Sequence, residues 1–207
     1  MASARFTQLK KRLTELRRTF LPIAFAPTGS YPAEQVDKTR AYRLLCHAEV
    51  EAYLEDISLA TVIKACDRWG ASRRVSRTLI ALITYSGTAP ARMLDVESNS
   101  LRTQREIDTA VQGAKEQFSR LAKVTNHGIR AADVRRLLFP AGVGEYDFDP
   151  LWLIEIDRFG VNRGETAHTA ARAATVAIPD PQTEYQTITT ILSGLERMDR
   201  RLAKLRQ

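Results

Sequence analysis

Apolar residues recur every three or four positions along most of the chain, which is the spacing of an amphipathic helix. The start of the chain predicts a helix over residues 4–20 from five such residues: Phe6, Leu9, Leu13, Leu16 and Phe20. The last segment carries a longer stripe, formed by Tyr185, Ile188, Leu192, Leu195, Met198, Leu202 and Leu205. Such a stripe suits the core of a helical bundle or a contact with a partner helix.

Capping residues, prolines and glycines place the ends of the other helices. Pro32 suits a first turn and Gly70 suits a helix end, so a long helix is predicted over residues 32–69. Ser72 is predicted to cap the next helix, which runs to about residue 85. Further helices are predicted over residues 101–125, 131–138, 150–160, 162–177 and from 181 onward. Two of these begin with an Asp-Pro pair, an N-cap residue followed by a first-turn proline.

The pattern predicts an all-α fold, because no segment alternates apolar and polar residues over the length of a strand. The 207 residues suffice for one domain of ordinary size with a sizeable core. We expect a single domain over residues 1–207, in which residues 1–30 form an added N-terminal helix and loop and residues 31–207 form the core bundle.

Composition narrows the class of protein. The chain is 44% hydrophobic and 27% charged, which is typical of a soluble globular protein, and no apolar run is long enough to suggest a membrane partner. The net charge of +7 favours a polyanionic partner such as nucleic acid, although many basic proteins bind none. Cys46 and Cys66 lie about 30 Å apart on one predicted helix and cannot bridge each other within it. We therefore expect buried reduced thiols, a cytoplasmic location, and no metal or cofactor, since the zinc spacings CxxC and HExxH are absent.

The long predicted helix carries acidic residues close to its buried side. Its apolar stripe is formed by Leu45, Cys46, Val50, Tyr53, Leu54 and Ile57. On this helix Glu49 falls at the edge of the apolar face, Glu51 is predicted to point outward, and His47 lies at the opposite margin. An acidic residue beside a core needs a partner, which Arg163 or another basic side chain would supply. Glu49 is therefore predicted either to form a structural ion pair or to take part in catalysis.

The stretch NRGETAH, residues 162–168, places an arginine and a histidine on one predicted helix. Asn162 is predicted to cap this helix, with Glu165 completing a capping box. Arg163 would then lie in the first turn, where the helix dipole favours anions; a bound phosphate or a nearby carboxylate would explain a cation there. Arg163 and His168 are about 140° apart around a regular helix. They converge only if Arg163 reaches from a frayed turn or if a second subunit completes the site.

Further basic residues lie near an aromatic side chain. Arg73 and Arg74 follow Trp69 closely in the sequence. Positive charge beside an aromatic ring suits nucleic-acid backbones and base stacking, although most such runs are solvated surface. We predict Arg73 and Arg74 as candidate contacts with RNA.

The Arg163–His168 motif, with four residues between its members, resembles the signature of the HEPN superfamily of helical domains, named for higher-eukaryote and prokaryote nucleotide binding. YRLLCHAEVEAYLED is similar to the early helix of that family, which carries an acidic or polar residue facing the motif. NHGIRAADVRRLLFPAGVGEYDFDPLWLIEIDRFGVNRGETAH is similar to the run into the motif in one prokaryotic branch, the RiboL-PSP-HEPN type. The resemblance covers residues 35–205 and treats the first helix as an elaboration.

The resemblance implies an α-helical bundle that dimerises face to face, so that two copies of the motif meet in one cleft. Many members of the family are metal-independent endoribonucleases of toxin–antitoxin and phage-defence systems. Others have lost the motif and bind RNA or proteins without catalysis. We therefore expect a homodimeric ribonuclease with RNA as its substrate and an antitoxin or another defence-system protein as a further partner. The alternatives are a non-catalytic HEPN module and a helical adaptor that acts through its last helix.

Residue roles follow from the expected chemistry, in which the RNA 2′-hydroxyl attacks its own phosphate and leaves a 2′,3′-cyclic phosphate and a 5′-hydroxyl. His168 is expected to act as general acid and base, and Arg163 is expected to stabilise the phosphoryl oxygens. Glu49 would orient one of these two residues, and Asn162 would hold a phosphate or cap its helix. His47, together with the two arginines after Trp69, would contact the substrate.

Overall fold

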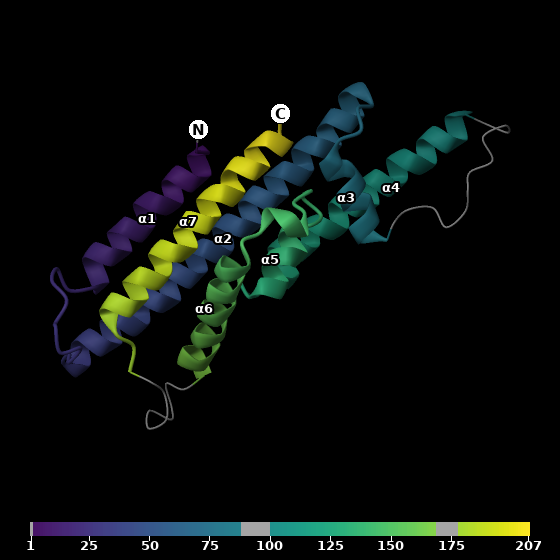
Figure 1. Cartoon of the computed structure of the whole chain (residues 1–207). Helices are drawn as coiled ribbons and strands as arrows, with labels where there is room; N and C mark the ends of the chain where they lie inside the picture. The colour runs from purple at the N-terminus through teal and green to yellow at the C-terminus, as the bar shows by residue number, and fades with distance from the viewer. Residues whose placement is uncertain (1, 88–99, 169–177) are drawn as a thin grey trace. The chain divides into compact units, whose positions relative to one another are not determined.

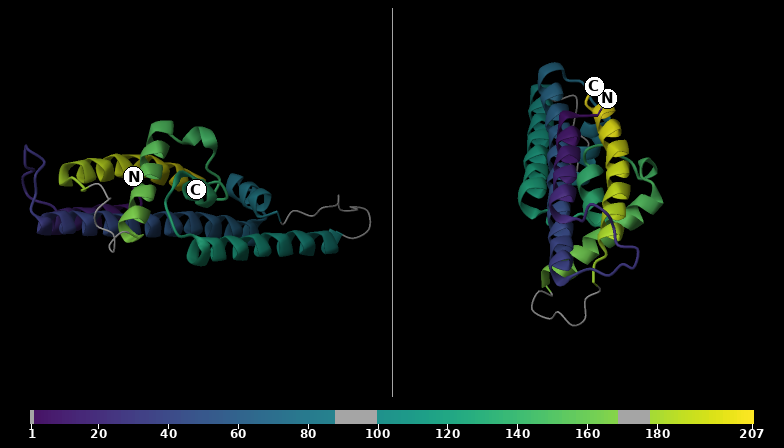
Figure 2. Two further views of the ribbon diagram at one scale, coloured as in Figure 1. Left: turned by 90° about the horizontal axis from the view of Figure 1, so that it is seen from below. Right: turned by 90° about the vertical axis from the view of Figure 1, so that its left-hand side faces the viewer.

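Most of the described residues fold into helices (Figure 1, Figure 2). The computed structural model describes residues 2–87, 100–168 and 178–207, and for residues 100–103 and 162–168 it describes the helical backbone alone. The α-helices are α1 (Ala4–Phe20), α2 (Ala33–Ser72), α3 (Arg77–Ser86), α4 (Ser100–Arg120), α5 (Ala131–Leu138), α6 (Pro150–His168) and α7 (Pro181–Leu205). A π-helical turn (Leu121–Thr125) follows α4, and a 3-10 turn spans Glu145–Asp147. No strand occurs in these ranges, so the predicted all-α class is confirmed.

Helix α1 begins and ends at the predicted residues. Ser3 caps it, because its hydroxyl accepts a hydrogen bond from the Phe6 N–H at 3.1 Å. The predicted apolar stripe is its inward face, and four of the five stripe residues are buried: Phe6, Leu9, Leu13 and Leu16. Burial of side chains of this size contributes about 1.5–3 kcal/mol each, so the stripe is enough to hold α1 against the bundle.

The predicted boundary between α2 and α3 was wrong. Helix α2 continues past Gly70 to Ser72, and Ser76 rather than Ser72 caps α3 by accepting from the Leu79 N–H at 3.2 Å. Arg73 adopts a left-handed backbone with φ of 56°, the conformation that glycine usually supplies after a helix, and its N–H bonds to the Trp69 carbonyl. A glycine inside a helix is tolerated at modest cost, so Gly70 did not mark the end.

The predicted break after Gly160 was also wrong, because α6 is one helix from Pro150 to His168. Gly160 has a packing reason: a Cβ atom there would lie 2.9 Å from the Arg130 Cγ and 3.2 Å from the Arg130 backbone nitrogen. Asn162 is therefore not an N-cap, Glu165 completes no capping box, and Arg163 does not lie in a first turn. The predicted extension to residue 177 falls outside the described residues.

Contacts group the chain into two compact units. The first unit comprises Met1–Tyr53, Gly128–Asp133 and Phe148–Arg200, and the second comprises Leu54–His127, Val134–Asp147 and Arg201–Gln207. The first unit thus holds α1 together with the first half of α2, α6 and most of α7. The N-terminal helix belongs to the same unit as the helix of the candidate motif.

In the first unit, α1, the first half of α2 and α7 run side by side (Figure 1, Figure 2). The ring of Phe6 meets that of Tyr53 edge-on at 5.8 Å, which joins α1 to α2. Asp199 of α7 is fully buried, and it accepts hydrogen bonds from the Tyr53 hydroxyl at 3.0 Å and from the Ser3 backbone N–H at 2.7 Å. This shared carboxylate ties the start of α1 and the middle of α2 to α7.

Helix α6 packs closely on α7 through Trp152. The indole N–H donates to the Ile191 carbonyl at 3.1 Å, and a Cβ atom at Gly194 would collide with the indole ring. Gly194 is therefore required for this approach. The predicted α7 stripe is largely confirmed: Ile188, Leu195, Met198 and Leu202 are buried, Leu192 and Leu205 are half-buried, and Tyr185 is 40% exposed.

The predicted state of the cysteines is confirmed, since Cys46 and Cys66 are both buried and free. Burial raises the pKa of both thiols above the ordinary value, so both stay protonated near neutral pH. In the ranges that the structure describes, none of the helices combines the length and the apolar character needed to traverse a bilayer.

Candidate functional site

The motif residues Asn162, Arg163 and His168 lie on α6, and their side chains fall outside the described part of the structure. Their backbone nevertheless decides one question. Arg163 and His168 occupy one continuous helix, so their positions are about 140° apart around its axis. The alternative in which Arg163 reaches from a frayed first turn is therefore removed.

His47 is the described residue that connects α2 to the motif helix. Its side chain is 2% exposed, and its ring lies 5.9 Å from that of Phe159, one helical turn before Arg163. Its Nδ1 atom lies 3.7 Å from a carboxylate oxygen of Glu51. This burial gives His47 an internal position between two helices, whereas contact with substrate was predicted from the sequence.

Of the two glutamates beside His47, Glu51 departs from its predicted position, whereas Glu49 lies at the predicted edge of the buried face and forms an ion pair. Glu51 was predicted to point outward, but its side chain is only 17% exposed and it lies against His47. Glu49 is 29% exposed and faces α1, where its carboxylate accepts from the Arg12 Nε at 3.1 Å. Arg12, rather than Arg163, is thus the partner of Glu49, and this contact raises the pKa of Arg12.

The stripe used to orient α2 explains this error. Leu45 was assigned to the buried stripe but is 36% exposed, whereas Arg43 and His47 are buried on the other flank. The true buried arc is therefore rotated toward α6. The contact between Glu51 and His47 does have a signal in the sequence, because the two residues are four positions apart and share a face of the helix.

A buried ion pair between α2 and α7 was not predicted. The Arg43 guanidinium makes two hydrogen bonds to the Glu184 carboxylate, one from its Nε at 3.0 Å, and both side chains are less than 10% exposed. Such a pair is satisfied in place, so it fixes α7 against α2 rather than offering a charge to a ligand. Its two members lie far apart in the sequence.

The second unit holds the two arginines that follow Trp69. Arg73 lies over the Trp69 ring at 5.4 Å and pairs with Asp108, which also accepts from the Trp69 indole N–H at 2.9 Å. This indole contact, followed by Arg73, lowers the pKa of Asp108. Arg74 is exposed and makes no ion pair or hydrogen bond within the described residues. Of the two predicted RNA contacts, Arg73 is neutralised by Asp108 and Arg74 is open to a ligand.

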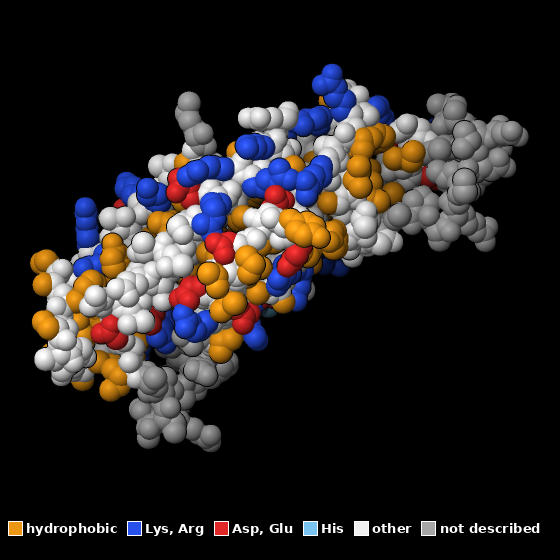
Figure 3. Space-filling model, in the orientation of Figure 1, with side chains coloured by type: hydrophobic (Ala, Val, Ile, Leu, Met, Phe, Trp, Pro, Cys, Tyr) orange, Lys and Arg blue, Asp and Glu red, His pale blue; other side chains and the backbone are white. Residues whose placement is uncertain are grey.

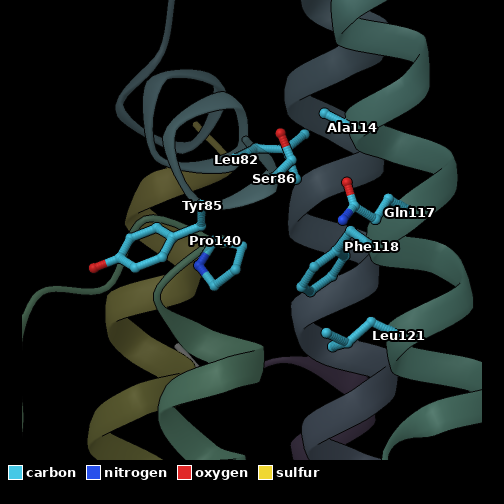
Figure 4. Close-up of a pocket in the computed structure, with 8 residues that line it drawn as sticks. All are labelled: Leu82, Tyr85, Ser86, Ala114, Gln117, Phe118, Leu121 and Pro140. Carbon is cyan, nitrogen blue, oxygen red and sulfur yellow. The ribbon is translucent and has the colours of Figure 1, made fainter. Parts of the chain in front are cut away.

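A small apolar cavity lies between α3 and α4 in the same unit (Figure 4). Leu82, Tyr85, Phe118 and Leu121 line it, and it encloses about 50 Å³. An engineered protein cavity of about 150 Å³ binds benzene, so this one is too small for a nucleobase. The cavity therefore adds no substrate site to the motif.

Among the described residues, no three His, Cys, Asp or Glu side chains are placed to hold a metal ion. A scan against protein-family models, a search of curated proteins and a search of solved structures found no match to this chain. The function is therefore argued from the residues themselves.

Proposed function

We propose that the chain is a homodimeric, metal-independent endoribonuclease of the HEPN type that acts in the cytoplasm, as an effector of a toxin–antitoxin or phage-defence system. One observation carries the proposal. The two motif positions belong to one unbroken helix, α6, which packs on α2 through Phe159 and His47 just before the motif. The net charge of +7 supports RNA as the ligand.

The proposed reaction needs one proton-transferring group and one cation. His168 takes the proton from the ribose 2′-hydroxyl as that oxygen attacks the adjacent phosphorus, and a protonated imidazole returns a proton to the departing 5′-oxygen. Arg163 stabilises the charge that builds on the phosphoryl oxygens. The products are a 2′,3′-cyclic phosphate and a 5′-hydroxyl, and no redox or hydrolytic step is required.

In this proposal the supporting acid is Glu51 rather than Glu49, and Glu51 acts through His47. Positions 47 and 49 are about 200° apart around α2. Since His47 faces α6, Glu49 faces away from it, toward Arg12 of α1. Glu51 lies 3.7 Å from His47 and is the acid on the flank that α6 covers. A carboxylate there fixes the orientation of His47, which packs on α6 just before Arg163.

Exposed apolar residues of α6 indicate where a second copy of the chain would dock. Leu151, Ile154 and Val161 of α6 are 77%, 62% and 37% exposed. Positions 154, 161 and 168 are spaced by seven and therefore share a face of the helix. Docking of another α6 over this face would cover exposed apolar surface and bring two copies of position 168 together.

The reaction is tested by incubating single-stranded RNA with the full chain in excess EDTA. We expect 2′,3′-cyclic phosphate products, and His168→Ala should slow cleavage at least about a hundredfold. His127→Ala, which removes an exposed histidine, is the matched control and should cleave like the wild type. Equal cleavage by His168→Ala would remove His168 from the mechanism. RNA binding without any cleavage by the wild type would favour the non-catalytic module.

The dimer face is tested separately with the double variant Ile154→Asp/Val161→Asp. We expect it to be monomeric by light scattering and to lose cleavage, because both charges would be buried at the subunit contact. Ile23→Asp changes an isoleucine that is fully exposed and should leave both properties unchanged. A double variant that keeps the wild-type mass would contradict this interface.

A further inference from the structure

Helix α1 concentrates the positive charge of the chain. Its 17 residues contain six basic side chains and one acidic side chain, a net charge of +5 in a chain whose total is +7. The rest of the chain is therefore close to electrical balance. The basic character that suggested a polyanionic partner resides mostly in a helix that the family resemblance treats as an elaboration.

The arrangement of α1 leaves much of this charge at the surface. Three basic residues that we call the α1 strip are exposed: Lys10, Lys11 and Arg18. Lys11 and Arg18 are seven residues apart, so they share the outer face and lie about 10 Å apart along the helix axis. Lys and Arg side chains follow α1 in the space-filling view (Figure 3).

Few carboxylates offset the α1 strip. The one acid of α1, Glu15, pairs with Arg12 at 3.5 Å, and Arg12 also holds Glu49 at 3.1 Å. Among the residues that the structure describes, the side chains of the three strip residues make no ion pair or hydrogen bond. Glu196 of α7 has a lowered pKa chiefly because of Arg200, and Lys10 adds a smaller coulombic effect. Most acids near the strip therefore already have a nearer cation.

We infer that the α1 strip binds backbone phosphates of the RNA strand at a site separate from the motif, and this inference depends on the proposed RNA substrate. Arg12 of α1 contacts Glu49, whereas Phe159 of α6 contacts His47. These two α2 positions are about 200° apart, so α1 and α6 flank α2 on opposite sides. The strip therefore holds RNA outside the bond that is cleaved and raises affinity without touching the reacting atoms.

A membrane surface fits this helix less well. An amphipathic helix binds a bilayer by burying its apolar face among lipids. In α1 that face is already used, since Phe6, Leu9 and Leu13 are 1%, 0% and 4% exposed. The hydroxyl of Ser3 also bonds to Asp199 at 2.5 Å, which fixes the helix start against α7. Only the cationic side chains remain available, and they suit a phosphate backbone.

The test measures binding of a labelled single-stranded RNA by the full chain over a series of salt concentrations, in a His168→Ala background that prevents cleavage. The strip variant is Lys10→Gln/Lys11→Gln/Arg18→Gln. The control, Lys38→Gln/Arg40→Gln/Arg135→Gln, makes the same change of charge at residues that are paired with carboxylates. Each lost phosphate contact lowers the slope of log K against log salt by about 0.7, so we expect the strip variant to lose about 2 and the control to keep the wild-type slope.

Each further outcome bears on the inference. Equal slopes for the two triple variants would overturn it, as would strip-dependent binding to phosphatidylserine vesicles with RNA binding unchanged. When His168 is kept, so that RNA is cleaved, the strip variant should raise KM for cleavage and leave kcat nearly constant. If the wild type cleaves RNA and the strip variant has the same KM, the inference about the α1 strip is wrong and the proposed reaction stands. If the wild type binds RNA through the α1 strip but cleaves none, the proposed reaction is wrong and the inference about the strip stands.

Discussion

Glu49 and Glu51 lie two positions apart on α2 and occupy different environments. Glu49 is 29% exposed and pairs across the surface with Arg12, whose side chain is 45% exposed. Glu51 is 17% exposed and lies against the buried His47, which in turn contacts Phe159 of α6. The first flank of α2 is a solvated contact with α1, and the second is an interior contact with the motif helix. Identical residue types on one helix thus belong to the surface or to the interior according to the helix that covers them.

The difference in burial implies a difference in energy. An exposed ion pair gains little, because water screens it and two long side chains lose freedom. A buried polar group costs free energy unless its partner stays in place, so loss of either member of the interior pair is more damaging. If matched substitutions on the two flanks of α2 destabilised the protein equally, this difference between the flanks would be contradicted.

The largest effect is expected for His47→Ala. Removal of a side chain that is 2% exposed leaves a cavity between α2 and α6 and deprives Glu51 of its neighbour, and we expect unfolding free energy to fall by about 3 kcal/mol. Urea unfolding of the full chain, followed by circular dichroism, measures it. Glu49→Ala is the matched change on the other flank and should cost much less. Equal losses would show that the flanks do not differ in burial as described.

The second-largest effect is expected on RNA cleavage, where Glu51 and Glu49 should differ in their effect on kcat. Glu51→Gln should lower kcat for cleavage by roughly tenfold to a hundredfold, because a slight displacement of positioned groups is enough for such a loss. KM should change little, since Glu51 lies inside the bundle. Glu49→Gln is the same substitution on the opposite flank of α2 and should leave kcat near the wild-type value. A larger loss for Glu49→Gln would return the supporting role to that residue.

Gly160→Ala tests the close packing of the interior flank. The new methyl group would lie 2.9 Å from the Arg130 Cγ and 3.2 Å from its backbone nitrogen, and we expect a loss of about 1–3 kcal/mol in urea unfolding. Gly70→Ala is the control, because a Cβ atom there meets nothing within 4 Å. Alanine is favoured over glycine inside a helix by about 1 kcal/mol, so this variant should be neutral or stabilising. Stabilisation by both changes would show that Gly160 is not required for packing.

The sequence predicted the elements that depend on local signals. Helix α1 was correct in both bounds because a regular apolar stripe runs along its length from Phe6 onward. Helix α6 was not, because the glycine at position 160 resembles a helix end in sequence, although it is there to admit Arg130. That reason involves a residue 30 positions away and cannot be read from the neighbouring sequence.

The candidate site shows the same limit. Glu51 was expected to point outward, but it is mostly buried against His47. The error came from Leu45, an apolar residue that is 36% exposed and that rotated the predicted buried face away from His47. The covered flank of α2 depends on where α6 packs, and tertiary contacts of this kind decide which polar residues are buried. The buried polar pairs around α7, such as Arg43 with Glu184, escaped prediction for the same reason.

The smallest effect is expected for the surface pair itself, measured by a double-mutant cycle of Arg12→Gln and Glu49→Gln. Each single variant should shift the urea midpoint slightly, by a small fraction of the shift for His47→Ala, because both side chains are partly solvated. The coupling free energy of this cycle should show a stabilising interaction between the two side chains at low ionic strength. It should vanish near 1 M salt, where exposed charges are screened within about 3 Å. The corresponding cycle of His47→Gln and Glu51→Gln should keep its coupling in the same salt, since that pair lies inside the bundle. A salt-resistant coupling between Arg12 and Glu49 would place that pair in the interior as well and remove the distinction between the two flanks of α2.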